Sequence, residues 1–261
     1  MEIRTINNRI VKIWTNEVDE NAINQITNLT TLPFLFHHLA IMPDVHAGKG
    51  MPIGGVLACE GAVIPNAVGV DIGCGMCAVK TNWSVEELPK EVIRKKIMKG
   101  IRERIPLGMD HHKEAQDAMY LPQGYDIDKM EIVKRRQNSI LHEVGTLGGG
   151  NHFIELQKDE DGNLWIMIHS GSRNLGKQVG DYYNKIAASL NEKWHSVVSP
   201  EIHLPFLALD TKEFGMYWNE MKYCIDFALC NRKLMMMRIQ EVIADCLKGI
   251  EFEPMINIAP N

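Results

Sequence analysis

Four glycine-rich segments, each placed after a short apolar run, constrain this sequence most. They are Pro43–Pro52, Val68–Met76, Gly145–Phe153 and His169–Arg173, and they hold nearly all of the polar residues suited to chemistry. Glycine at the end of a strand lets the backbone turn sharply and come close to a ligand. Loops that follow strand ends also commonly carry functional side chains. The sequence therefore predicts strands whose terminal loops carry the functional residues.

The apolar runs themselves predict the strands. Those bounded by glycine or proline lie at 10–14, at 34–42 before Pro43, at 54–59 and at 76–80. Two further runs, at 153–156 and 165–168, are separated by the turn signal Asp161-Gly162-Asn163 and predict a β-hairpin.

Helical periodicity dominates the rest of the chain. Ser84 and Glu87 form a capping-box pattern, and isoleucines recur every four residues from Ile93 to Ile105. Residues 106–140 predict a loop with one helix near its end. Apolar faces predict two more helices, over 179–194 and 214–242. Strands followed by helices indicate an α+β fold with mixed sheets and flanking helices. Since there is no clear linker, we expect a single domain over 1–261.

Composition excludes several classes of protein. The net charge is −5, so the chain is not a wholly basic nucleic-acid binder, and an RNA partner would need a local patch. No apolar run is long enough to span a membrane, and the N-terminus lacks a signal-peptide pattern. The six cysteines show no disulfide framework, which favours reduced thiols in the cytoplasm.

Asp71 and Cys74 lie three residues apart on a tight glycine turn. A carboxylate supplies a hard oxygen and a thiolate can bridge two metal ions, so the pair suits a metal site. The alternative is a small buried cysteine in a turn capped by Asp71, and the spacing alone leaves both open. Cys77 completes a C-x-x-C pattern. Since no second pair exists and the residues after Cys77 predict a strand rather than a helix, we interpret Cys77 as a core thiol.

His152 and His169 are the strongest histidine candidates. His152 follows three glycines and precedes an apolar strand, and His169 ends the next strand. If the two strands pair, both histidines lie near the same open end of the hairpin, where they suit metal ligation. The alternative is two satisfied structural histidines. Together with Asp71 and Cys74 they form a mixed oxygen, sulfur and nitrogen set, which favours an open catalytic site over a closed structural zinc site.

Positive charge is clustered locally. Basic runs at 94–104 and 134–136 are either solvated helix faces or contacts for a phosphate backbone. His46 lies beside Lys49 in a glycine-rich loop and is compatible with a phosphate contact. The Asn231-Arg232 pair interrupts the apolar face of the last helix. A buried pair of this kind needs partners, so it either braces the loops or holds an anion.

The four segments together resemble the RtcB family of RNA-splicing ligases. The matching pieces are PDVHAGKGMPIG at 43–54, VGVDIGCGM at 68–76, GTLGGGNHFIE at 145–155 and HSGSRNLG at 169–176. Asn231-Arg232, with the methionine run after it, also resembles the family. The match extends over nearly the whole chain and implies an RtcB-like fold.

The resemblance implies an activity. Family members join RNA ends that carry a 2′,3′-cyclic phosphate or a 3′-phosphate to ends that carry a 5′-hydroxyl, in tRNA processing and RNA repair. They use GTP and two Mn²⁺ ions. A histidine is guanylylated, the guanylyl group moves to the RNA 3′-phosphate, and the 5′-hydroxyl then displaces GMP. Manganese rests on the resemblance alone, because thiolate and imidazole ligands by themselves favour zinc.

The resemblance also implies roles for individual residues. Cys74 would bridge the two metal ions, Asp71 and His152 would complete the ligands of one ion, and His169 would serve the other. The guanylate would be contacted by Asn151, with Phe153 and Glu155 nearby.

One departure from the family pattern affects these expectations. A His-Asn-Tyr motif would supply a third ligand to the ion at His169, and Pro260 stands at that place. The guanylylated histidine would lie further along the chain. We therefore expect an RtcB-like fold that lacks its C-terminal part, and no GMP adduct on this chain alone. The chain would be a fragment, a truncated reading frame, or one part of a split enzyme whose C-terminal part another chain supplies.

Three functions remain open from the sequence. The leading one is an RNA ligase of the RtcB class, with the nucleophile outside this chain. The second is a catalytically incomplete fragment that binds metal and RNA. The third is a metal-dependent cyclic phosphodiesterase, since opening a cyclic phosphate needs the metal ions but not the nucleophile.

Overall fold

A computed structural model describes residues 1–69 and 71–258. It divides the chain into two compact units, Met1–Val70 with Gly180–Trp218 and Asp71–Val179 with Asn219–Asn261. The expectation about Pro260 lies outside the described residues. None of the helices in the described ranges combines the length and apolarity needed to cross a membrane.

The first unit is built on a four-stranded sheet in the order β1-β2-β3-β4. Its strands are β1 (Glu2–Ile6), β2 (Arg9–Ile13), β3 (Leu35–His46) and β4 (Ile53–Cys59). β2 and β3 are parallel and the other pairs are antiparallel. The parallel pair is connected through α1 (Glu20–Leu29), which begins at Asp19, where the carboxylate accepts a hydrogen bond from the Ala22 amide. Helix α1 buries Ile26 and Leu29 in the same apolar cluster as Leu39 of β3.

The prediction that this third strand ends before Pro43 is wrong. β3 continues through Pro43 to His46. Its pairing with β2 stops at Ile41, and its register with β4 shifts between Ile41 and His46. Proline lacks an amide hydrogen and is tolerated in strands only at edges or irregularities. Pro43 lies in this irregular stretch, so the strand passes through it.

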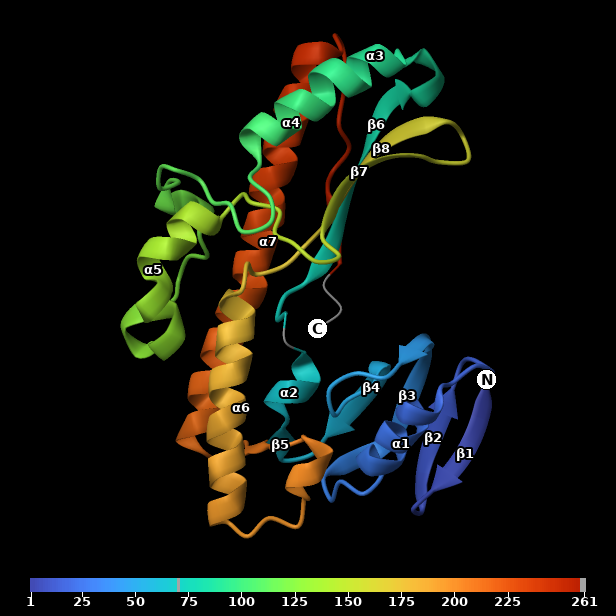
Figure 1. The fold of residues 1–261 in the computed structure, drawn as a ribbon, viewed down its shortest axis with the longest axis vertical. Helices are drawn as coiled ribbons and strands as arrows, with labels where there is room; N and C mark the ends of the chain where they lie inside the picture. The colour runs from blue at the N-terminus through green and yellow to red at the C-terminus, as the bar shows by residue number, and fades with distance from the viewer. Residues whose placement is uncertain (70, 259–261) are drawn as a thin grey trace. The chain divides into compact units, whose positions relative to one another are not determined.

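The first unit also contains short elements and the ends of two long helices. A two-stranded sheet pairs β5 (Ala62–Val63) with β9 (Leu207–Ala208). The short elements α2 (Pro65–Val68) and η5 (Pro200–Ile202) lie in loops of this unit (Figure 1). Both α6 (Leu175–Lys193) and α7 (Lys212–Cys246) contribute residues to this unit and to the other, and both confirm the helices predicted there.

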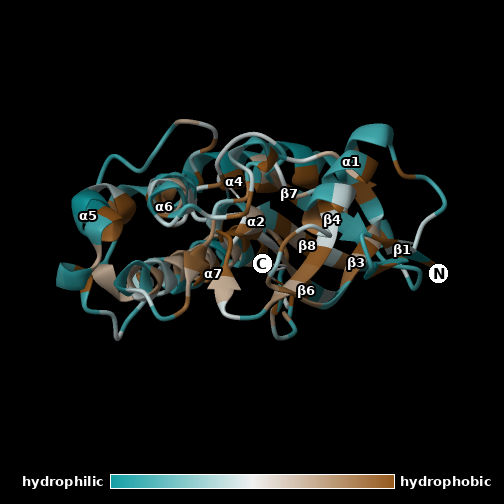
Figure 2. Ribbon diagram, turned by 90° about the horizontal axis from the view of Figure 1, so that it is seen from below, coloured by the Kyte–Doolittle hydropathy of each residue, from teal (hydrophilic) through white to brown (hydrophobic). Residues whose placement is uncertain are grey.

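The second unit contains a four-stranded sheet in the order β10-β6-β8-β7. Its antiparallel strands are β6 (Gly75–Ser84), β7 (Phe153–Lys158), β8 (Asn163–Ser170) and β10 (Ile256–Ile258). The predicted hairpin is confirmed as β7 and β8, and Gly162 in its turn has φ of 88°. Strand β8 alternates between buried and half-buried residues, and most of it is coloured as apolar in Figure 2.

One face of this sheet packs against helices. Ile166 and Ile168 of β8 share a buried cluster with Ile239 and Ile243 of α7. Cys77 belongs to the same cluster and is 1% exposed, as predicted for a core thiol. In Figure 1, α4 (Met98–Arg104) runs beside the end of α7. The helices therefore cover one side of the strands that lead to the glycine-rich loops.

The prediction of a helix that begins at Ser84 is wrong. Ser84 accepts a hydrogen bond from the Glu86 amide and caps only a 3₁₀ turn, η1 (Val85–Glu87). The helix begins after Pro89 and runs as α3 (Lys90–Val92), a π-helical turn η2 (Ile93–Ile97) and α4. A spacing of four residues exceeds the α-helical 3.6, and the wider π turn takes up the difference. The isoleucines therefore stay on the face that meets the core.

The segment between this helix and the β7–β8 hairpin matches the predicted loop with one late helix. It contains η3 (Ala118–Tyr120), η4 (Ile127–Lys129) and α5 (Glu131–Glu143). The buried Glu220 carboxylate of α7 accepts hydrogen bonds from three backbone amides at the start of α5. A carboxylate at a helix N-terminus is favourable for the helix dipole. The α+β class with mixed sheets is confirmed, and the single-domain assignment stays a prediction.

Candidate metal centre

Strand pairing brings three of the glycine-rich loops to one end of the second sheet. β6 begins at Gly75, directly after Cys74, and Gly75 pairs with Ser170 at the end of β8. β7 begins at Phe153, directly after His152, and Phe153 pairs with His169. In this antiparallel order, the start of β6, the end of β8 and the start of β7 are neighbours. The loops that carry the candidate ligands therefore meet.

The four predicted ligands lie together at this sheet end. The Cys74 Sγ atom is 3.1 Å from His169 Nε2 and 3.7 Å from His152 Nε2. All three atoms lie within 4.8 Å of one another, an arrangement that could hold a metal ion. Asp71 Oδ2 is 3.1 Å from His152 Nε2. The four side chains are half-buried, so the cluster is shielded by protein on one side and open on another.

Backbone carbonyls fix the orientation of both imidazoles. His152 Nδ1–H donates to the Leu147 carbonyl at 3.1 Å, and His169 Nδ1–H donates to the Asn151 carbonyl at 3.1 Å. A carbonyl oxygen can only accept, so each Nδ1 carries the proton and a neutral ring has its lone pair on Nε2. Metal-binding histidines are commonly oriented by this kind of outer hydrogen bond. Both Nε2 atoms therefore point into the cluster.

This orientation produces a contact that needs a positive charge. In the neutral imidazole, His152 Nε2 is an acceptor, and it faces the Asp71 carboxylate, which is also an acceptor. Two acceptors at 3.1 Å repel unless a cation lies between them. That cation is either a proton on His152 or a metal ion bound by both residues. The contact between these two side chains is therefore compatible with a metal ion bound by both of them.

The local environment changes the pKa values of the other ligands. Burial raises the pKa of the Cys74 thiol to about 12, and the Asp71 charge adds to the rise. Burial also opposes ionisation of Asp71, but hydrogen bonds and charge from His152 outweigh it and lower the pKa of Asp71 overall. Burial, followed by the charge of His152, lowers the pKa of His169. Without metal, Cys74 is therefore a thiol at neutral pH, and His169 favours the neutral form that can bind a metal.

Two glycines permit these loops to pack closely. Gly73 has φ of 84°, and a Cβ atom there would lie 2.8 Å from the Cys224 carbonyl oxygen of α7. Gly171 has an ordinary φ, but a Cβ atom there would lie 2.5 Å from Asp71 Oδ2. The absence of a side chain at Gly73 lets the Asp71–Cys74 loop pack against α7. The second makes room for the Asp71 carboxylate.

Asn231 and Arg232 hold the same loops from α7. Both are fully buried. The Asn231 carboxamide accepts from the amides of Gly145 and Thr146 and donates to the Gly171 carbonyl. The Arg232 guanidinium donates to the Gly73 and Ser170 carbonyls at 2.9 and 2.8 Å. These contacts support the interpretation that the pair braces the loops.

The other predicted residues occupy more peripheral positions. Asn151 is exposed and contributes its carbonyl to His169. The Phe153 ring lies 5.5 Å from the His169 ring, and Glu155 is exposed beside Gln157 on the edge strand β7. Their contact with a guanylate stays a prediction. His46 belongs to the first unit, where its Nδ1–H donates to the Asp44 carbonyl, and its phosphate contact also stays a prediction.

The sequence interpretation assigned no individual role to Arg173 or Leu147. Arg173 is 9% exposed, has φ of 56° and donates to Thr146 Oγ1 at 2.7 Å and to the Gly108 carbonyl at 3.0 Å. It thereby holds the loop that precedes His152. Leu147 acts through its carbonyl, which accepts from both His152 and Ser170. A role played by a backbone carbonyl cannot be read from a sequence. The arginine in Ser-Gly-Ser-Arg, in contrast, is a side chain that the sequence shows and that could have been singled out.

Comparisons with known proteins identify relatives of this chain. The family profile described as "tRNA-splicing ligase RtcB" matches residues 25–261. A protein of Escherichia coli named RNA-splicing ligase RtcB is 36% identical over 91% of this chain and 62% of its own length. A protein of Thermococcus kodakarensis named tRNA-splicing ligase RtcB is 26% identical over 93% of this chain and 60% of its own length. The chain thus spans about three fifths of the curated relatives that it matches.

We expect Gly171→Ala to weaken metal binding about 10- to 100-fold, because the added methyl group displaces the Asp71 carboxylate. The measurement is isothermal titration of the metal-free protein with Mn²⁺ and with Zn²⁺. Gly149→Ala is the matched control, since the atom nearest to its added methyl group is 3.7 Å away and its φ is not left-handed. Equal affinities for the two variants would contradict a role for Asp71 at the metal.

We also expect metal affinity to rise with pH. A metal that binds Cys74 as a thiolate displaces its proton at any pH below the thiol pKa of about 12. One displaced proton predicts a rise of about tenfold per pH unit between about pH 7 and about pH 9. Titrations in buffers of different ionisation enthalpy measure the proton release directly. Cys74→Ser should lower the release and Cys230→Ser should not, and a pH-independent affinity in the unchanged protein would rule out thiolate ligation.

Proposed function

Because this chain belongs to the RtcB family, we propose that it carries the metal site of an RNA ligase of that class. The reaction joins an RNA end with a 2′,3′-cyclic phosphate or 3′-phosphate to an end with a 5′-hydroxyl, and uses GTP and two Mn²⁺ ions. One observation carries the proposal. With its Nδ1 proton committed to Leu147, His152 faces the Asp71 carboxylate at 3.1 Å, and Cys74 and His169 lie beside them.

The side chains fit the implied metal ions. A thiolate, two imidazoles and a carboxylate are all ordinary ligands of first-row divalent metals. We propose Asp71, Cys74 and His152 as ligands of one ion, and Cys74 with His169 as ligands of the second. Bound divalent ions would neutralise phosphate charge and orient the attacking and leaving oxygens.

The protein residues have separate tasks in this proposal. Leu147 and Asn151 orient the imidazoles through their carbonyls, and Asn231 with Arg232 keeps the loops at fixed distances. Asn151 contacts the guanylate of GTP, with Phe153 and Glu155 nearby. No residue of this chain is proposed here as the guanylylated histidine. The relatives' names, which specify RNA-splicing and tRNA-splicing ligases, support RNA as the substrate. We propose the cytoplasm as the place of the reaction.

A second candidate function is metal-dependent opening of the 2′,3′-cyclic phosphate. The observation that favours it is the location of all four candidate ligands within one compact unit of this chain. Metal binding and phosphodiester opening would then need no further residue, whereas the transfer of a guanylyl group needs a nucleophilic histidine. A module that binds metal and RNA without catalysis is the third candidate.

The experiment follows the fate of a labelled RNA. The purified protein is incubated with Mn²⁺, GTP and RNA fragments that carry a 2′,3′-cyclic phosphate and a 5′-hydroxyl, and the products are separated by electrophoresis. The ligase proposal predicts that this chain alone leaves the ends unjoined, and that joined RNA, which requires both GTP and metal, forms once the part of the enzyme that supplies the guanylylated histidine is added. The phosphodiesterase predicts a 3′-phosphate product without GTP, and the binding module predicts unchanged RNA.

Two variants test whether the cluster performs the reaction. Cys74→Ala and His169→Ala should lower the rate of whichever reaction is found by at least about a hundredfold, since each removes a proposed ligand. His38→Ala is the matched control, because His38 has no place in the cluster. Normal rates in the first two variants would disprove the assignment of the cluster to the reaction.

A further inference from the structure

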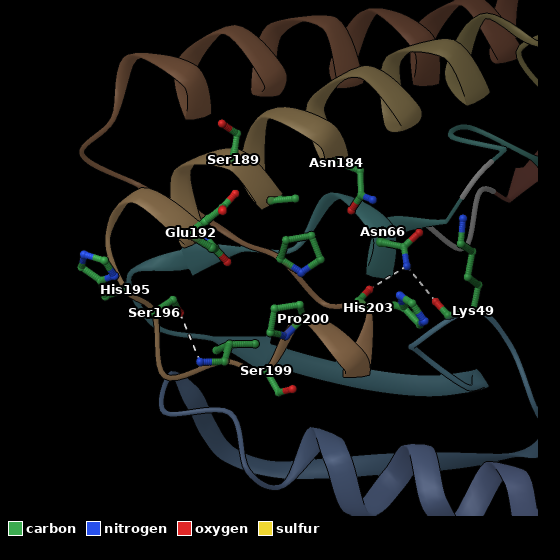
Figure 3. Close-up of a pocket in the computed structure, with 14 residues that line it drawn as sticks. Lys49, Asn66, Asn184, Ser189, Glu192, His195, Ser196, Ser199, Pro200 and His203 are labelled. Carbon is green, nitrogen blue, oxygen red and sulfur yellow. Dashed lines mark hydrogen bonds between the residues drawn. The ribbon is translucent and has the colours of Figure 1, made fainter.

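The first unit contains a cavity that the metal cluster does not involve. Its volume is about 590 Å³, and all of its lining residues belong to this unit. The walls come from the last turns of α6, the loop that follows them and the residues around Lys49 and Asn66 (Figure 3). This volume lies within the range of small-molecule sites, about 300–1,000 Å³.

Hydrogen bonds give the cavity fixed walls. Asn191 of α6 donates to the Phe206 carbonyl at 2.8 Å and accepts from the Phe206 amide at 3.0 Å. Asn66 donates through Nδ2 to the carbonyls of Lys49 and His203, at 2.8 and 2.9 Å. Two carboxamides thus fasten the segments that line the cavity to one another. The site is therefore formed before any ligand arrives.

Asn184 has an oxygen that lacks a partner. Its Oδ1 atom is buried and accepts no hydrogen bond among the described residues. Figure 3 shows its side chain extending from α6 toward Asn66 across the cavity. Since Asn66 uses its Nδ2 group on two carbonyls, its own Oδ1 is available as a second acceptor. A buried acceptor without a partner is costly, so a ligand that brings a donor is favoured here.

Charge is distributed unevenly along the cavity. Lys49 lies beside Asn66 and is exposed, and it makes no ion pair within the part of the chain that the structure describes. Glu192 lies further along α6, on the other side of Asn184 (Figure 3). A phosphate is therefore attracted toward Lys49 and repelled from Glu192. Ala188, Val198 and Pro205 supply apolar surface to the lining of the cavity.

We propose that this cavity binds a nucleotide whose base carries an exocyclic amino group beside an acceptor ring nitrogen on its Watson–Crick edge, as adenine and cytosine do. The amino group donates to Asn184 Oδ1, the base rests on the apolar wall, and the phosphate lies at Lys49. An amino group beside a ring nitrogen is the edge that an asparagine carboxamide recognises, since it accepts from the first and donates to the second. The nucleotide is either free or part of a single-stranded RNA, where unstacked bases are recognised in this way. The inference does not depend on the proposed ligase function.

Fluorescence anisotropy with labelled hexanucleotides tests this site, in the absence of metal and GTP so that the ligase reaction does not contribute. We expect oligo(A) and oligo(C) to bind about tenfold more tightly than oligo(U), the low end of what one such base contact provides. Asn184→Leu should remove this preference. Asn184→Ala should do the same without adding apolar bulk. Competition by free AMP at comparable affinity would identify a mononucleotide site, and its failure to compete would identify RNA.

Lys49→Met tests the phosphate position. It should weaken binding of all three oligonucleotides alike and lower the salt dependence of binding by about one counterion. Two variants of exposed residues in the same unit are matched controls, Asn24→Leu on α1 and Lys185→Met on α6. Thermal melting checks that every variant is folded. Equal affinity for the three oligonucleotides, or a preference that survives both Asn184 substitutions, would overturn the proposal.

Discussion

The buried side chains of Asn231 and Arg232 hold together the loops on which the candidate site depends. Asn231 joins the Gly145–Thr146 turn to Gly171, and Arg232 joins Gly73 to Ser170. These loops come from three separate parts of the chain, and antiparallel pairing of β6, β8 and β7 brings them only to the same sheet end. A guanidinium and a carboxamide without water around them must have protein partners. The hydrogen bonds that Asn231 and Arg232 make therefore fix the distances between the loops, and among the described residues Arg232 Nη2 is left without a partner.

The metal cluster follows from this arrangement. Each ligand in the cluster lies next to a strand end or to a residue that Arg232 holds. The reactive atoms of Cys74, His152 and His169 therefore lie within 4.8 Å of one another. The outer hydrogen bonds to the Leu147 and Asn151 carbonyls then select the nitrogen that faces the centre. Because the Cys74 thiol keeps its proton at neutral pH without metal, binding of a metal to its thiolate releases that proton. Folding, ligand orientation and proton release are thus linked through the same few atoms.

The sequence predicted what local patterns encode. The β7–β8 hairpin followed from two apolar runs and the turn signal at Gly162, and it correctly placed His152 and His169 at one end. The pairing of β6 with β8 joins residues far apart in sequence, which no local pattern reveals. The grouping of Cys74 with the histidines therefore rested on ligand chemistry, and its bridging role came from the resemblance. Pro43 and Ser84 were misleading because an irregular strand and a 3₁₀ turn accommodate residues that usually end a strand or begin a helix. The cavity around Asn184 depends on tertiary contacts and left no motif.

The central claim is that Asp71, Cys74, His152 and His169 bind metal directly. Anomalous diffraction from crystals of the protein grown with Mn²⁺ tests it most directly, because the signal gives the ion's position without reference to activity. We predict an anomalous peak within coordination distance of Cys74 Sγ and His152 Nε2, and its loss in crystals of Cys74→Ser. A well-ordered cluster with no peak, or a peak only at other residues, would contradict the claim.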